Sequence, residues 1–322
     1  MEAHAFETPG RSQDETGRLR SSLNDLVLRL ADAHTELTSG RIDAGMRRIV
    51  ETLAALRESL PAERWRALCS SPRLRPIRSV LHEDPHAWRG HAKPRGYAGD
   101  PVLLDYVYGC APLPEGTSRF GRNVYLWAAE HSSAFRSVRR RRAALAEMID
   151  AAAARRPGAR VLSIAAGHLR EAQLSSAVAN RDLGELVALD HDSHSLDVVR
   201  ASFAGLPVRC VQGTLGELVA GRLEPGEFDL IYAGGLFDYL PDPIARRLTT
   251  VLASRLAPGG ELVIGNFSRC REAGYMEAIM EWFLVYRTEA EMLSLAEETG
   301  ESVLRTWTDP EGVMRYLAVA RV

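Results

Sequence analysis

Residues 159–322 alternate between short apolar segments and longer amphipathic ones, and this alternation restricts the fold more than any other feature of the chain. Apolar runs such as "RVLSIAA" and "ELVALDHD" have the length of buried strands. Strands separated by helices of ordinary length pair in parallel and carry helices on both faces of the sheet. We therefore expect an α/β fold with a doubly wound, mostly parallel sheet.

The remaining elements follow in order along this half of the chain. Further strands are expected in "VRCVQG", "FDLIYAGG" and "GELVIGNF". The last segments, "SVLRTWTD", the turn "PEGV" and "MRYLAVARV", predict a hairpin that adds an antiparallel strand to the sheet. The expected helices are "LREAQLSSAVAN", "SHSLDVVRASFAG", "PIARRLTTVLASRLA", "REAGYMEAIMEWFLVY" and "TEAEMLSLAEETG".

The first half of the chain predicts a separate helical domain. Residues 1–18 are polar and expected to be disordered, and residues 19–121 open with an antiparallel helix pair around the "TSG" break. Pro61 suits the start of a third helix, Ala62–Cys69. Residues 91–109 form an expected lid within this domain. Residues 122–158 are expected to form two connecting helices, near 123–136 and 137–155, before the sheet domain at 159–322.

Charge and cysteine usage argue against several kinds of partner. The net charge of −2 gives no general electrostatic case for nucleic acid, and Arg139 to Arg142 are interpreted as a solvated helix face. No apolar run reaches the roughly 18 residues that cross a bilayer, and the N-terminus lacks the apolar segment of a signal peptide. The four cysteines form no CxxC pair, which suits the reduced thiols of a cytoplasmic protein. The expected partner is a small molecule rather than nucleic acid or a membrane, and a homodimer is left open.

The turn after the first strand, "VLSIAAGHLRE", carries a reduced glycine signature. It has Gly167 preceded by Ala165 and Ala166, where a dinucleotide fingerprint would show three glycines. Asp190 ends the next strand at the place of a ribose-binding acid, and Gly213 with Thr214 could border a flat base. NAD would need the full fingerprint to seat its pyrophosphate. S-adenosylmethionine (SAM) has no phosphate, so the reduced turn favours SAM.

The ordered set "VLSIAAG", "ALDHD", "CVQGT", "FDLIYAGGLFDYL" and "LAPGGELVIGNF" resembles a class I SAM-dependent methyltransferase over residues 159–322. A narrower resemblance, carried by "KPRGYAGD", "AGGLFDYL" and "WFLVYR", spans roughly 80–322. It is to the bacterial methyltransferases of 3-hydroxy fatty acid methyl ester synthesis, which make a quorum signal. The resemblance implies a Rossmann-like fold, SAM as cofactor and S-adenosylhomocysteine (SAH) as product.

Three groups of site residues follow. The residues expected at the cofactor are Ala165, Ala166, Gly167, Asp190, His191, Gly213, Thr214, Gly235, Leu236 and Phe237. The residues expected to act in catalysis are Tyr97 and Asp100 of the dense lid motif "KPRGYAGD" and Asn266 at the end of the fifth strand. The residues expected to hold the acceptor are Lys93, Arg95, Asp238, Glu281, Trp282, Tyr286 and Arg287, the last three on the helix after the fifth strand.

The acceptor chemistry stays open between alternatives. A carboxylate acceptor needs no base, only cations or donors such as Lys93, Arg95 and Arg287. An amine or guanidine acceptor needs acids to orient it, and Asp100, Asp238 and Glu281 could serve. A third alternative is a SAM-binding sensor or scaffold without catalysis. The scattered histidines form no metal-ligand cluster, so no metal is expected.

Overall fold

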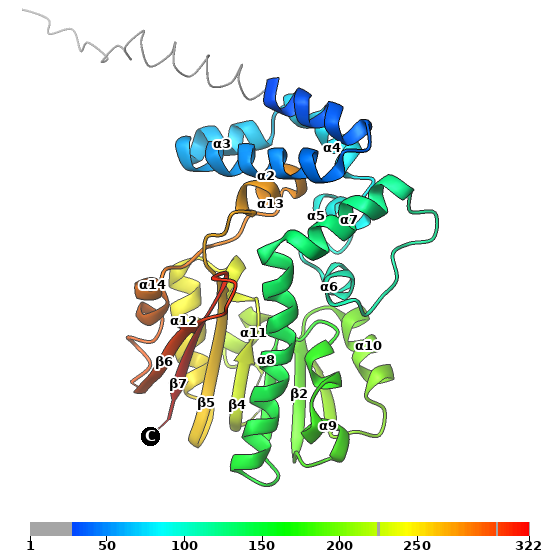
Figure 1. Cartoon of the computed structure of the whole chain (residues 1–322). Coiled ribbons are helices and arrows are strands. Elements are labelled where there is room, and N and C mark those ends of the chain that lie inside the picture. Colours follow the sequence, from blue (N-terminus) through cyan, green and yellow to red (C-terminus); the bar gives the residue numbers. More distant parts are fainter. Residues whose placement is uncertain (1–27, 224–225, 301, 322) are drawn as a thin grey trace, which may run out of the picture.

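The computed structural model describes residues 28–223, 226–300 and 302–321. A layer of helices from the first half of the chain lies across one end of a sheet built by the second half (Figure 1). The expected disorder of residues 1–18 lies outside the described residues.

The sheet has seven strands in the order β3-β2-β1-β4-β5-β7-β6. Strands β1 to β5 pair in parallel, and β7 pairs antiparallel with β5 and β6. The doubly wound sheet and its terminal hairpin are therefore confirmed. The strands are β1 Arg160–Ile164, β2 Glu185–Asp190, β3 Val208–Gln212, β4 Phe228–Ala233, β5 Leu256–Phe267, β6 Ser302–Thr308 and β7 Met314–Ala320.

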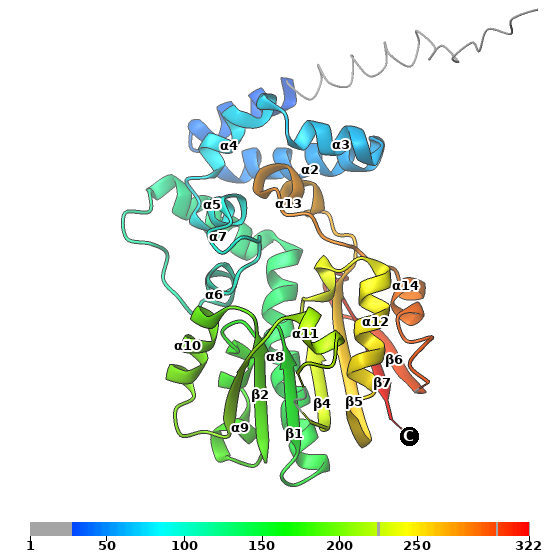
Figure 2. The ribbon, with the colours of Figure 1, turned by 180° about the vertical axis from the view of Figure 1, so that it is seen from behind.

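Both faces of the sheet are covered, as the near-continuous apolar strands require (Figures 1 and 2). Side chains alternate between two cores, so Val161 packs on one face and its neighbour Leu162 on the other. The helices of the first face are α8 Ser133–Arg155, α9 Ser176–Asn180 and α10 Ser193–Ser202. Those of the second are α11 Leu215–Val219, α12 Asp242–Ala253 and α14 Glu289–Ser294.

The helical layer begins with the expected antiparallel pair, residues 28–38 and α2, joined around Gly40 in a left-handed turn (φ 83°). The third expected helix, α3, is confirmed. Helices α4 to α6 lie within residues 75–108, which are rich in Pro and Gly and where the sequence analysis predicted no helix. Prolines in their first turns, and aspartate caps before α5 and α6, start these helices. The helices are α2 Ile42–Ser59, α3 Ala62–Cys69, α4 Arg75–Leu81, α5 Pro85–Ala92, α6 Pro101–Tyr108 and α7 Arg119–His131. No helix formed by the described residues has the length and apolar character needed to cross a membrane.

Helix α13 (Ala273–Met280) returns from the second half of the chain to the helical layer (Figure 1). It packs so closely on α2 that a Cβ at Gly274 would lie 2.5 Å from the carbonyl oxygen of Leu53. The buried Glu277 carboxylate accepts hydrogen bonds from Arg57 Nε at 2.7 Å and from Trp65 Nε1. The helical layer thus contains pieces from both halves of the chain.

Three helix predictions are wrong in their extent. The expected helix "LREAQLSSAVAN" is a 3₁₀ turn, Arg170–Gln173, followed by α9, because the Ser175 hydroxyl caps α9. The connecting helices meet at Ser132, whose hydroxyl caps α8, rather than near residue 136. The expected helix "REAGYMEAIMEWFLVY" ends at Met280, since Glu281 adopts a left-handed conformation (φ 50°), and residues 281–288 are not helical.

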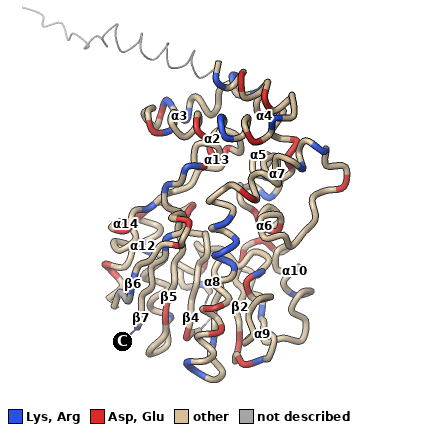
Figure 3. The backbone as a smooth tube through the Cα atoms, in the orientation of Figure 1, with Lys and Arg blue, Asp and Glu red and all other residues tan. Residues whose placement is uncertain are grey.

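The interpretation of Arg139 to Arg142 as a solvated face is also wrong for three of the four, since Arg140 alone among them is exposed. Arg139 Nε donates to the carbonyl oxygen of Val107 at 2.6 Å, and Arg142 Nε donates to that of Arg170 at 2.9 Å. Arg141 is 6% exposed. Figure 3 marks the basic residues of α8 at the level of α6. These side chains tie the connecting helix to its neighbours.

Candidate functional site

The turn after β1 is tight and left-handed at three positions: Ala165 (φ 53°), Gly167 (φ 55°) and Leu169 (φ 50°). This conformation is uncommon for residues other than glycine, and such outliers gather at functional sites. The turn is held by its neighbour strand, because Ala166 N donates to Leu189 O at 3.1 Å and Gly167 N to Asp190 Oδ2 at 2.8 Å.

A cavity of about 540 Å³ lies over the carboxyl ends of β1, β2 and β4, where doubly wound sheets bind ligands. The turn after β1 forms its floor, and α6 and α8 form walls. The predicted site residues that line it are Tyr97, Ala165, Ala166, Gly167, Asp190, His191, Gly213, Thr214, Gly235, Leu236, Asp238 and Trp282. Those that do not are Lys93, Arg95, Asp100, Phe237, Asn266, Glu281, Tyr286 and Arg287.

Asp190 is the acid best placed on the cavity wall. It is 4% exposed, and its carboxylate accepts backbone hydrogen bonds from Gly167 at 2.8 Å and Asp192 at 2.9 Å. A carboxylate offers about four acceptor positions, so two bonds leave it capacity toward the cavity. His191 lies beside it, with Nδ1 3.3 Å from Asp190 Oδ1.

The lid is fastened to the sheet domain on two sides of Tyr97. Arg95 Nη1 donates to Asp192 Oδ2 at 2.6 Å and to Ser195 Oγ at 2.8 Å, so Arg95 holds the lid rather than facing the cavity. On the other side, the Tyr239 hydroxyl donates to Ala98 O at 2.9 Å. Tyr97 is half-buried over the cavity, and burial raises the pKa of its phenol, which stays neutral.

Asp100 is a structural residue, contrary to the catalytic role predicted for it. Its Oδ1 caps α6 by accepting from Leu103 N at 2.9 Å and also accepts from Arg89 Nε at 2.8 Å. The side chain is 1% exposed and outside the cavity lining. An Asp before Pro at a helix start is a capping signal that the sequence carried and that we assigned to chemistry.

Asn266 and Arg287 also leave the predicted site, because they are buried together behind it. Asn266 Nδ2 donates to the carbonyl oxygens of Phe267 and Val285, and its Oδ1 accepts from Arg287 Nη1 at 2.6 Å. Arg287 donates further to the carbonyl oxygens of Phe237 and Leu240. These bonds brace the non-helical segment after α13, and the Phe237 side chain is fully buried in the core.

The remaining acceptor candidates lie apart. Glu281 pairs with Arg78 at 2.9 Å on the helical layer, and Lys93 ends α5 in a left-handed conformation (φ 49°). The Tyr286 hydroxyl is buried with no hydrogen-bond partner among the described residues. Of the acceptor candidates, Asp238 and Trp282 line the cavity, and Trp282 Nε1 donates to the Tyr239 hydroxyl at 2.9 Å.

Sequence reasoning missed a polar wall contributed by α6 and the turn. Asp105 accepts from Arg170 Nε at 2.7 Å and lies 2.9 Å from His168 Nδ1. Burial opposes ionisation of Asp105, but the bonds from Arg170 and His168 outweigh it and lower the pKa of the carboxyl. The signal was present as "GHLRE", yet its acidic partner lies 63 residues earlier on α6.

A second missed group lines the cavity near the end of β4. Arg141 Nη1 donates to Gly234 O and Nη2 to the Tyr108 hydroxyl, both at 3.1 Å. Asp238 shares this part of the cavity, and burial raises the pKa of its carboxyl to about 7 despite the nearby Arg141 and Arg287. The small residues of "AGGLFDYL" were the only sequence signal for this opening.

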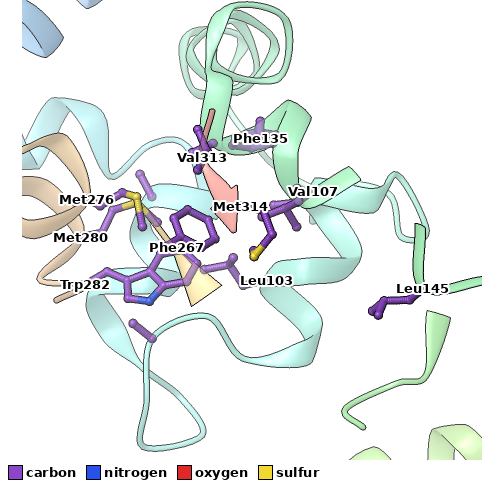
Figure 4. Close-up of a cluster of buried hydrophobic side chains, with 14 of the residues drawn as sticks. Leu103, Val107, Phe135, Leu145, Phe267, Met276, Met280, Trp282, Val313 and Met314 are labelled. Carbon is purple, nitrogen blue, oxygen red and sulfur yellow. The ribbon is translucent and has the colours of Figure 1, made fainter. Parts of the chain in front are cut away.

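A narrower apolar cavity of about 50 Å³ adjoins the main one, between the helical layer and the sheet. Leu104, Val138, Phe267 and Trp282 line both cavities. Figure 4 shows Phe267 and Trp282 beside Met276 and Met280 of α13. The main cavity therefore has a small apolar neighbour on the side of the helical layer, with four lining residues in common.

Comparison with known proteins gives a fold and no family. No protein-family model and no curated protein matches the chain. Among solved structures, a possible exported protein from Bordetella parapertussis is similar over 90% of this chain and 96% of that one, at 19% identity and a TM-score of 0.58. This likeness establishes a shared fold.

Two weaker likenesses are to methyltransferases. One is magnesium protoporphyrin IX methyltransferase from Synechocystis PCC 6803 with bound SAH, at 14% identity and a TM-score of 0.44 over 69% of this chain and 99% of that one. The other is a TehB-like SAM-dependent methyltransferase from Corynebacterium glutamicum, at 19% identity and a TM-score of 0.41 over 59% and 98% of the two chains. Neither likeness is close enough to carry an argument about this chain.

Proposed function

We propose that this chain is a class I SAM-dependent methyltransferase that acts on a small molecule. The observation that carries the proposal is the cavity over β1, β2 and β4, with a left-handed turn on its floor and the buried Asp190 on its wall. An acid at this position can accept hydrogen bonds from both ribose hydroxyls, while the turn with its single glycine lacks the amide-rich loop that a pyrophosphate needs.

The residues of the cavity fit SAM in its three parts. Asp190 has free acceptor positions for the ribose, and Gly213 and Thr214 border the space beside it for the base. The cavity also holds groups of both charges for the amino-acid tail. Arg141 of α8 could pair with its carboxylate, and Asp105 of α6 could pair with its ammonium group. When bound, SAM supplies an activated methyl group. The work left to the chain is to align the acceptor with it and to exclude water, which the fastened lid supports.

For the acceptor, we propose carboxyl O-methylation. The acids of the amine alternative do not come together, because Asp100 and Glu281 pair with Arg89 and Arg78 outside the cavity. The cations expected for a carboxylate, Lys93, Arg95 and Arg287, lie outside it as well, but two other arginines, Arg141 and Arg170, line it. The buried Asp238 has a pKa near 7 and is a weak counter-charge for an ammonium group at neutral pH. The small apolar cavity beside the main one, lined in part by Met276 and Met280 of α13, supports an acid with an apolar tail. This is compatible with the resemblance to 3-hydroxy fatty acid methyl ester enzymes and with a role in bacterial signalling or specialised metabolism.

Calorimetry with SAM, SAH and NAD tests the cofactor, and we expect SAM and SAH to bind and NAD not to bind. Tight NAD binding with no SAM signal would remove the proposal. Turnover is then assayed with labelled SAM against fatty acids, amino acids and guanidines. Release of a base-labile methyl ester supports carboxyl methylation, whereas a base-stable product supports the amine alternative. SAM binding without turnover on any acceptor favours a sensor or scaffold.

A further inference from the structure

Arg141 is a buried cation on the wall of the main cavity. It is 6% exposed, and none of the ion pairs formed by the described residues includes it. Its two hydrogen bonds go to uncharged groups, the Gly234 carbonyl and the Tyr108 hydroxyl. A guanidinium has five N–H donors, and a buried charge without a counter-ion is costly to keep. Its position is best explained by an anion that occupies the cavity.

The surroundings are shaped around the guanidinium. A Cβ at Gly235 would lie 2.6 Å from Arg141 Nη1, and a Cβ at Gly234 would lie 3.0 Å from Leu145. A larger residue at position 235 would therefore push the Arg141 guanidinium away from this place. Gly235 of "AGGLFDYL", which the sequence marked only as part of an opening, makes room for a cation at the strand end.

Tyr108 and Asp238 complete the local chemistry. The Tyr108 hydroxyl accepts from Arg141, so its own proton remains available to a ligand. Asp238 faces the same region, and a carboxyl group with a pKa near 7 is only a partial counter-charge at neutral pH. An arginine flanked by a phenol donor matches a carboxylate, which arginine binds through two parallel hydrogen bonds.

We propose that Arg141 and Tyr108 form a carboxylate-binding site in the cavity. Two ligands of the proposed function carry that group: the amino-acid tail of SAM and the carboxylic acid acceptor. The assignment of either ligand rests on the proposed function, whereas the site itself rests on the buried, unpaired cation.

Two matched ligand pairs test the site by calorimetry. SAH and 5′-methylthioadenosine share the adenosine, and only SAH has the carboxylate; decanoate and decanol share the chain, and only decanoate is an acid. The variants are Arg141→Met, Arg141→Lys and Tyr108→Phe. The control is Arg140→Met, because Arg140 is the neighbouring arginine of α8 and its side chain is 55% exposed.

We expect Arg141→Met to weaken the carboxylate member of at least one pair by tenfold or more and its partner by less than twofold. Arg141→Lys and Tyr108→Phe should give smaller losses in the same member, and Arg140→Met none. A loss for SAH alone identifies the cofactor tail, and a loss for decanoate alone identifies the acceptor. If wild type binds neither adenosine compound, the proposed function fails and the decanoate pair still decides the site.

The inference is overturned if both members of each pair weaken alike, if neither changes, or if wild type binds neither carboxylate. A purely structural Arg141 would also show itself in thermal unfolding. Met removes an uncompensated buried charge but also the hydrogen bonds to the Gly234 carbonyl and the Tyr108 hydroxyl, so Arg141→Met should melt close to wild type. If it melts well below wild type, the binding comparison is made with Arg141→Lys. The site is then overturned if this variant binds each of the four ligands with the affinity of wild type.

Discussion

Asp190 lines the cavity, and two backbone N–H groups use part of its hydrogen-bonding capacity, so the rest is free for the ribose of the proposed cofactor. Asp190→Ala should weaken SAH binding by about 1–3 kcal/mol, the cost of leaving buried hydroxyls unpaired. The melting temperature should fall modestly, because Gly167 N and Asp192 N lose their hydrogen-bond acceptor. Asp197→Ala, an exposed acid on α10, is the control and should change neither. Unchanged SAH affinity in Asp190→Ala would place the ribose-binding group elsewhere.

A second single residue, Asp238, should make the free energy of unfolding depend on pH. Burial raises its pKa from 3.8 to about 7, so the folded protein holds a proton that the unfolded chain releases above pH 4. The stability that this proton contributes is present at low pH and is lost as the pH rises toward 7, by up to about 1.4 kcal/mol per pH unit. Asp238→Asn lacks this titration.

Urea unfolding between pH 4 and 8 measures the difference in the free energy of unfolding between wild type and Asp238→Asn. The stability of wild type relative to the variant should decline up to pH 7 and then level off. The other buried acids with a raised pKa among the described residues, Asp84 and Glu171, are present in both proteins and cancel. A constant difference across the range would show that Asp238 titrates normally in the folded state.

At the scale of the element, the expected lid lines the cavity through Tyr97 and Gly99, and two of its glycines provide a matched pair. Gly96 (φ 87°) and Gly99 (φ 74°) are both left-handed, but a Cβ meets nothing within 4 Å at Gly96 and overlaps Trp282 and the Tyr239 hydroxyl at Gly99. Gly96→Ala should therefore cost about 1 kcal/mol of backbone strain. Gly99→Ala should cost more and displace the lid.

Thermal unfolding and SAH affinity are measured for both variants. Gly99→Ala should melt lower than Gly96→Ala and bind SAH several-fold more weakly, whereas Gly96→Ala should bind SAH like wild type. Equal behaviour of the two variants would mean that the lid does not need its close approach to Trp282.

At the scale of the whole molecule, α13 and the residues just before it contact α2 through two ion pairs of different burial. Glu277 is 2% exposed against Arg57 and Trp65, whereas Arg271 and Glu51 pair in solvent. Glu277→Ala should lower the free energy of unfolding by about 2–3 kcal/mol, because the partly buried Arg57 loses its counter-charge. Glu51→Ala should cost less than about 0.5 kcal/mol. Urea denaturation compares them, and similar losses would show that the buried pair does not join the layers.

The order of strands and helices in the second half of the chain was predictable, because apolar periodicity is a local property that burial on both faces of a sheet imposes. The turn after β1, Asp190 and the glycines at the end of β4 were predictable for a related reason. In a parallel sheet all strand ends reach the same edge, so strand order alone places these residues around one cavity.

Only the tertiary structure decided which charged side chains face that cavity. Asp100, Asn266 and Arg287 resemble catalytic residues in sequence, yet all three lie outside the cavity lining. Asp100 Oδ1 caps α6 and pairs with Arg89, and Asn266 and Arg287 bond to each other. Arg141 resembles a solvated residue in a basic run, yet α8 turns it inward against the glycines of β4. Periodicity records whether a residue is apolar; whether a charge is buried, paired or left for a ligand depends on long-range contacts that no local pattern encodes.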